Sequence, residues 1–283
     1  MKLLEGLRVV STALNLPGPA ACARLRDLGA TVAKIEPPSG DPFEQFCPAW
    51  YRRLHDGVTV GRLDLKSDTG QRAMARLLEG ADLLVTAQRA SALERMGLDR
   101  ARLSKSYPEL CHVAITGHAP PDDELPGHDL TYLAAHGLVS PPHLPRTLFA
   151  DMAGAERAVS TALALVVARA RTGKGEAAAA PLADAARALA QPLHEGLTRE
   201  GALLGGGYAG YNLYAARTGW VAVAALEPRF EKRLAEKFDL GALTVERLRE
   251  LFASHDAGYW EEWARKNDLP IVAVRESFPP AGS

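Results

Sequence analysis

Cysteine is scarce in this sequence, and so are aromatic side chains, which make up 6% of the 283 residues. The three cysteines, Cys22, Cys47 and Cys111, are odd in number and far apart. This spacing indicates neither a disulfide framework nor a cysteine-based metal site. We therefore expect reduced thiols, a cytoplasmic protein and no bound metal ion.

A surplus of charge and a long apolar run are also missing. The net charge is −1 at pH 7, which argues against a nucleic-acid partner because neutralising phosphates needs a basic surplus. The most apolar stretch, residues 158–168, is much shorter than the roughly 20 residues that cross a bilayer. Charged residues interrupt the apolar start, so we expect no signal peptide and no membrane partner.

Short apolar runs alternate with helical patterns through the first part of the chain. Residues 7–36 read as strand, helix and strand, with Gly29 where the helix ends. Residues 61–87 repeat this order with Gly80 closing the helix, and residues 93–117 add a third helix and strand. The predicted fold class is α/β, with a Rossmann-like, doubly wound parallel sheet.

A loop rich in proline and aspartate, residues 118–129, follows the third strand. Ligands of such sheets gather at the carboxyl ends of the strands, so this loop is a candidate site. Residues 151–170 predict a long helix, and the alanine-rich stretch that follows it is expected to become helical at about Leu182.

Five glycines in residues 201–210 mark a boundary. Beyond it, an alternating stretch predicts a β-hairpin that turns at Thr218 and Gly219, followed by amphipathic helices. We therefore divide the chain into a large Rossmann-like domain, residues 1–200, and a small α+β domain, residues 201–283.

Two glycine-rich nucleotide signatures are missing from the sequence. The turn at residues 171–175 lacks the spacing of a P-loop, and no G-x-G-x-x-G follows the first strand. The turn is therefore not a cradle for a nucleoside triphosphate, and the second absence weakens the alternative of an NAD-dependent dehydrogenase.

Residues 14–42, LNLPGPAACARLRDLGATVAKIEPPSGDP, closely resemble the opening of family III CoA-transferases. This group includes formyl-CoA transferase, carnitine CoA-transferase and α-methylacyl-CoA racemase. The likeness continues in order along nearly the whole chain, through LDLKS (63–67), ADLLV (81–85), LERMGL (93–98), GHDLTYLA (127–134), FADMAGAERA (149–158), RARTGKGE (169–176) and AALEPRF (224–230). Seven weak motifs in colinear order make a chance match improbable.

The resemblance implies an enzyme that acts on acyl-CoA thioesters, as an interlocked homodimer, without a covalently bound cofactor. The PGP, GHD and EP-x-F motifs favour the racemase branch. There, His128 and Asp151 would be the acid/base pair and Glu227 a supporting carboxylate. In the transferase alternative, Asp151 would attack the thioester carbonyl and pass CoA to a second acid. The residues expected to contact CoA, in a cleft between the domains, are Gly18, Lys34, Arg89, Tyr132 and Lys174.

Three of these residues could also have a purely structural role at their positions in the sequence. Asp151 directly precedes a helical pattern, so it is expected to be a helix N-cap that the helix dipole holds as an anion. Glu227 precedes Pro228 where a helix starts, a common structural arrangement. His128 lies in the loop at the predicted ligand edge, where the alternative is a solvated surface histidine.

The sequence also departs from the family pattern. Where family members usually carry an asparagine and a Lys-Arg pair before LDLKS, this chain has His55, Val58 and Thr59. Its C-terminal return to the large domain is expected to be shortened. These departures support a third alternative from another class, a catalytically weak or inactive CoA-binding paralogue or partner subunit.

Overall fold

The computed structural model describes residues 2–275. The chain forms two compact units, one up to Ala190 and one from Gln191 onward. The boundary predicted at residue 200 thus falls inside the second unit, and the division into domains 1–200 and 201–283 stays a prediction.

The first unit is built on a parallel sheet of six strands in the order β3-β2-β1-β4-β5-β6. This is the strand order of the Rossmann fold, so the predicted α/β class is correct. The strands are β1 Arg8–Ser11, β2 Thr31–Glu36, β3 Thr59–Arg62, β4 Leu83–Thr86, β5 Cys111–Thr116 and β6 Ala177–Pro181.

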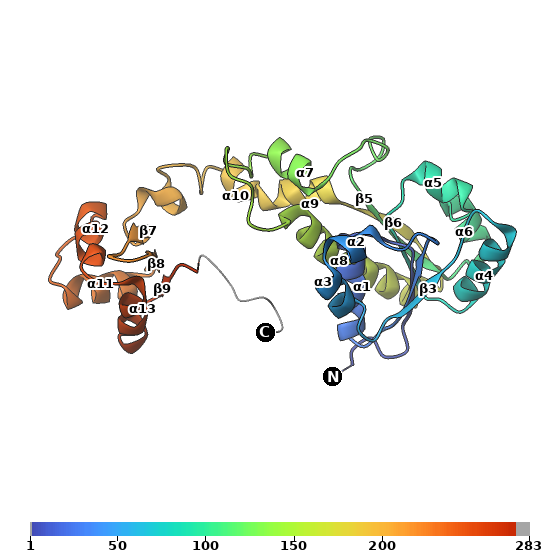
Figure 1. The fold of residues 1–283 in the computed structure, drawn as a ribbon, viewed down its shortest axis with the longest axis horizontal. Helices are drawn as coiled ribbons and strands as arrows, with labels where there is room; N and C mark the ends of the chain where they lie inside the picture. The colour runs from blue at the N-terminus through green and yellow to red at the C-terminus, as the bar shows by residue number, and fades with distance from the viewer. Residues whose placement is uncertain (1, 276–283) are drawn as a thin grey trace. The chain divides into compact units, whose positions relative to one another are not determined.

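Helices cover both faces of this sheet (Figure 1). They are α1 Pro17–Asp27, α2 Pro42–Phe46, α3 Pro48–Leu54, α4 Asp68–Glu79, α5 Ala90–Arg95, α6 Arg100–Ser106, α7 Asp129–Ala135, α8 Phe149–Thr172 and α9 Leu182–Leu189. Alternate side chains of a strand point to opposite faces. Val9 and Val113 therefore pack in one core with α1 and α8, and Val10 and Leu84 pack in another with α4, α5 and α6.

Three local features differ from the predicted pattern. Residues 93–110 hold the end of α5 and a second short helix, α6, because Gly97 between them has a left-handed φ of 71°. The LDLKS segment leads into α4 and lies outside β3. The helix predicted from about Leu182 is confirmed as α9, but the alanines before it form the edge strand β6, whose side chains are small enough to pack under α8. Local propensity gives no signal for a strand of alanines.

The second unit pairs a small antiparallel sheet with short helices. Its order is β7-β8-β9, with β7 Tyr211–Ala215, β8 Trp220–Ala224 and β9 Ile271–Ala273. The predicted hairpin turn at Gly219 is present, with a φ of 80°. The helical segments are α10 Gln191–His194, η1 Leu203–Gly207, α11 Pro228–Lys237, α12 Val245–Ala253 and α13 Ala257–Lys266.

Trp260 is the centre of the core of the second unit. Its side chain is 2% exposed, and its ring packs against Phe238, Phe252 and Trp263. The indole Nε1 donates to the Phe252 carbonyl at 2.8 Å, which satisfies its buried donor.

Two expectations lie beyond what this single chain describes. The predicted homodimer stays a prediction, and the predicted shortened C-terminal return falls after residue 275, outside the described residues. Within residues 2–275, no helix is both long and apolar enough to cross a membrane.

Candidate active site

A cavity of about 190 Å³ opens at the carboxyl ends of β1, β4 and β5. The segments that follow these strands line the cavity, with Asn15 and Pro17 after β1, Gln88 and Arg89 after β4, and Gly117 after β5. β1 and β4 are neighbours whose chains continue to opposite sides of the sheet. This is the topological switch point at which ligands of such sheets bind.

Four of the sequence-predicted site residues line this one cavity: Arg89, His128, Tyr132 and Asp151. His128 is exposed and is the N-cap residue of α7, where its backbone N–H donates to Thr131 Oγ1 at 3.0 Å. Tyr132 follows one turn later in α7, and Asp151 lies in the first turn of α8. The structure thus brings together two of the three residues predicted as catalytic.

The prediction that Asp151 is a helix N-cap is wrong. Helix α8 begins at Phe149, so Asp151 is its third residue. The capping group comes from Asp129, which is 5% exposed and whose Oδ1 accepts from the amides of Ala150 at 2.7 Å and Asp151 at 3.0 Å. A long-range carboxylate therefore satisfies the helix start, and sequence reasoning missed its role although Asp129 adjoins His128.

Asp151 is a weaker acid than an ordinary aspartate. Burial, and then repulsion by the Asp129 carboxylate, raise the pKa of Asp151 from 3.8 to about 6. The sequence predicts an anion stabilised by the helix dipole; with a pKa of about 6 the group is mostly ionised at pH 7 and takes up a proton below that pH. A carboxyl group with a pKa near neutrality both accepts and returns protons efficiently, which suits general acid–base chemistry.

Tyr132 is a buried residue of the cavity wall. Its side chain is 3% exposed, and a Cβ added to Gly117 or Gly127 would come within 2.5 Å or 2.4 Å of it. Both glycines therefore leave the space that the tyrosine fills. Burial and the Asp151 carboxylate raise the pKa of Tyr132, so its hydroxyl stays protonated and able to donate.

Arg89 supplies positive charge at the cavity. It is exposed, precedes α5 as its N-cap residue, and is the sole arginine or lysine among the described lining residues. Next to it, Gln88 joins two strand ends, because its Oε1 accepts from Thr12 Oγ1 at 2.9 Å. Gln88 and Asn15 gave no signal in the sequence, since their positions follow from the strand order.

Four predicted site residues do not line the cavity: Gly18, Lys34, Lys174 and Glu227. Gly18 lies in the first turn of α1, where an added Cβ would meet Ala13 Cβ at 2.2 Å, so its missing side chain serves packing. Lys34 is 1% exposed, which disagrees with its predicted contact with CoA. Lys174 follows the far end of α8, whose 24 residues extend roughly 35 Å at about 1.5 Å per residue.

Glu227 belongs to the second unit. It is the N-cap residue of α11, with Pro228 at the first helical position, as the sequence predicted. Its predicted role beside His128 stays a prediction. No cluster of metal-ligating side chains occurs among the residues that the structure describes.

A family model and two curated relatives match this chain. A family model described as CoA-transferase family III matches residues 4–277. The chain is 30% identical over 257 residues to human α-methylacyl-CoA racemase, covering 84% of this chain and 65% of the relative. It is 35% identical over 196 residues to cinnamoyl-CoA:phenyllactate CoA-transferase of Clostridium sporogenes, covering 62% of this chain and 47% of the relative.

The similarity extends to solved structures. A hypothetical protein of Mycobacterium tuberculosis superposes with a TM-score of 0.83 at 24% identity, covering 97% of this chain and 84% of that chain. This likeness shows the fold. The chain spans about half to two thirds of the length of the two curated relatives, 47% and 65%.

Proposed function

Because the chain belongs to CoA-transferase family III, we propose that it acts on acyl-CoA thioesters by racemase-type 1,1-proton transfer. The observation that carries the proposal is the presence of His128 and Asp151 in one cavity, with the pKa of Asp151 raised to about 6. Inverting a carbon centre needs one group to remove a proton and a second group to deliver one.

In this reaction, one of the two side chains takes the α-proton of the acyl group. The electron pair moves into the thioester, forming an enolate, and the other side chain returns a proton to the opposite face of the α-carbon. At pH 7 a group with a pKa of about 6 is mostly ionised, so Asp151 is competent as the base. Arg89 carries the positive charge expected to meet an anionic part of the substrate.

The test is deuterium incorporation at the α-carbon of a 2-methylacyl-CoA in D₂O, without an acceptor acid. We expect incorporation and loss of optical activity with the native protein and neither with Asp151→Asn. Stable optical activity in the native protein, with no incorporation, would refute the racemase proposal.

The second candidate is CoA transfer, and the transferase from Clostridium sporogenes at 35% identity favours it. Asp151 would attack the thioester carbonyl and expel CoA thiolate, which would then attack the aspartyl carbonyl of the resulting anhydride, release the donor acid and form an aspartyl-CoA thioester. The acceptor acid would attack this thioester and expel the thiolate again, and the thiolate would attack the acceptor carbonyl of the second anhydride, which forms the new acyl-CoA and frees Asp151. Dependence of turnover on an acceptor acid, together with trapping of an aspartyl ester by hydroxylamine, would establish this alternative.

A non-catalytic CoA-binding protein is the candidate from another class. Its support is the sequence at His55, Val58 and Thr59, which lacks the usual Lys-Arg pair. Calorimetric titration with acetyl-CoA and free CoA tests binding directly. Binding without proton exchange or transfer would favour this candidate, and no binding at millimolar ligand would remove the enzymatic proposals. The homodimer and the cytoplasmic location remain predictions.

A further inference from the structure

The loop between β1 and α1 has an unusual backbone at the cavity. Asn15 lines the cavity and has a left-handed φ of 64°. Asparagine tolerates this region better than most residues, but without a constraint it also populates extended and helical conformations. The shape of this cavity wall therefore needs a partner that fixes it.

That partner is Asp41, 26 residues away along the chain. The Asp41 side chain is fully buried, and its Oδ1 accepts from the Asn15 amide at 3.0 Å. The same oxygen accepts from the Phe43 amide at 2.9 Å and so caps helix α2. One buried carboxylate thus joins the cavity loop to the start of a helix.

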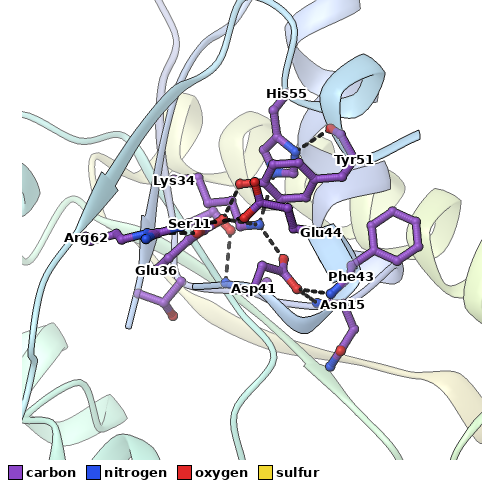
Figure 2. A network of polar contacts seen from close by, with 12 residues as sticks. Ser11, Asn15, Lys34, Glu36, Asp41, Phe43, Glu44, Tyr51, His55 and Arg62 are labelled. Atoms are coloured by element: carbon purple, nitrogen blue, oxygen red, sulfur yellow. Dashed lines mark hydrogen bonds and ion pairs between the residues drawn. The ribbon is translucent and has the colours of Figure 1, made fainter. Parts of the chain in front are cut away.

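A buried lysine holds the other oxygen of Asp41. Lys34 Nζ lies 2.5 Å from Asp41 Oδ2 and 3.0 Å from Glu36 Oε1, and all three side chains are at most 1% exposed (Figure 2). At the edge of this network, Arg62 Nε lies 3.8 Å from Glu36 Oε2. Because the charges are desolvated and paired, the Asp41 carboxylate has a fixed position.

His55 and Tyr51 complete the surroundings of Lys34. An ammonium group only donates, so His55 Nε2 accepts from Lys34 at 3.0 Å, and His55 Nδ1 donates to the Tyr51 carbonyl at 2.7 Å. The Tyr51 hydroxyl donates to Glu36 Oε1 at 2.7 Å. His55, one of the positions that depart from the family pattern, therefore has a defined place in this network.

We propose that Asp41 is a positioning residue of the candidate active site. It does not line the cavity; it acts through the Asn15 amide, holding the β1–α1 loop in the shape that receives the substrate. The buried Lys34 in turn holds Asp41. The turnover part of this inference rests on the proposed function, whereas the tether between Asp41 and Asn15 is independent of it.

The experiment compares Asp41→Ser with Asp99→Ala by amide hydrogen exchange at single-residue resolution and by turnover. Serine remains a good N-cap for α2, but it is too short to hold Asn15 and Lys34 as well. Asp99 is the matched control, because it caps α6 through the Arg102 amide at 3.0 Å and contacts neither the loop nor Lys34.

We expect Asp41→Ser to speed exchange of the Asn15 amide about tenfold or more, the factor for losing a hydrogen bond to a charged group. We also expect a fall of about tenfold in kcat/KM for the thioester, since misplaced binding groups cost rate. The pH at which Asp151 titrates in the rate profile should not move. Asp99→Ala should change neither Asn15 exchange nor kcat/KM by more than about twofold, within ordinary surface effects.

Unchanged exchange at Asn15 in Asp41→Ser would overturn the tether. Faster exchange with unchanged kcat/KM would overturn the positioning role and leave only a structural one. If Asp41→Ser does not fold, the native protein decides the question, because an Asn15 amide that exchanges without protection contradicts the tether. If the native protein turns over no thioester, the proposed function fails, and the exchange measurement still tests the tether by itself.

Discussion

Replacing Asp151 by asparagine should make the protein more stable at neutral pH while it removes activity. The pKa of Asp151 is about 6 in the folded protein against 3.8 for an ordinary aspartate. As the pH rises from about 4 to 6, the unfolded chain ionises this group while the folded protein keeps it neutral. Stability present below pH 3.8 is therefore lost as the pH rises, and the loss is complete above pH 6.

The size of this effect follows from the two pKa values. The step from 3.8 to about 6 corresponds to roughly 3 kcal/mol, at about 1.36 kcal/mol per pH unit. Asparagine does not ionise, so Asp151→Asn should exceed the native protein in stability by up to roughly 3 kcal/mol at pH 8 and by little at pH 4. The cap of α8 survives because Asp129 provides it. Turnover should fall by about 10²–10⁴-fold, as expected for losing an acid–base group.

Urea unfolding of both proteins between about pH 4 and pH 8, followed by circular dichroism, measures the difference. The control is Asp27→Asn, since the Asp27 side chain is 55% exposed and lies far along α1 from its first turn. We expect the control to follow the native protein at each pH. A stability difference between Asp151→Asn and the native protein that stays constant with pH would refute the reasoning, and so would retained turnover.

Three further substitutions test other parts of the structure. Asp129→Asn keeps an oxygen for the α8 amides but removes a charge, so the pKa of Asp151 should fall and the acid limb of kcat/KM should move to lower pH; an unmoved limb contradicts the role of Asp129. Gly154→Ala places a Cβ 2.2 Å from Leu182 Cδ2, so thermal unfolding should show a loss of about 1–3 kcal/mol; unchanged stability would mean that Leu182 moves freely. Trp260→Ala should cost about 3–5 kcal/mol in the unit from Gln191 onward, and a smaller loss in denaturant unfolding would show that this core repacks.

Features of the fold that depend on neighbouring residues were predictable from the sequence. The apolar strands, Gly29 after α1 and Gly80 after α4 all carry local signals, and the structure has them at the predicted places. The strand β6 carries no such signal, because alanine favours helices. It forms because small side chains fit between β5 and the long helix α8.

The cavity was predictable only in part, because contacts between residues distant in sequence leave no local signal. His128 and Asp151 belong to recognisable motifs, and the loops at strand ends indicated the correct edge of the sheet. The partners that set their chemistry are distant in sequence. Asp129 contacts α8 across 21 residues and Asp41 contacts Asn15 across 26, and neither spacing corresponds to a periodic pattern. Lys34 looked available for a ligand because burial and pairing with two carboxylates are not visible in one sequence.

The carboxylate of Asp129 reverses the usual influence of a helix start on nearby acids. Free amides at such a position attract anions and make carboxyl groups stronger acids. At α8 the amides of Ala150 and Asp151 already donate to an anion that belongs to the chain itself. A second negative charge placed there meets repulsion, and these two donors are in use. Helix α8 therefore keeps a weak acid in its first turn, one of the right strength to exchange protons with its surroundings near neutral pH.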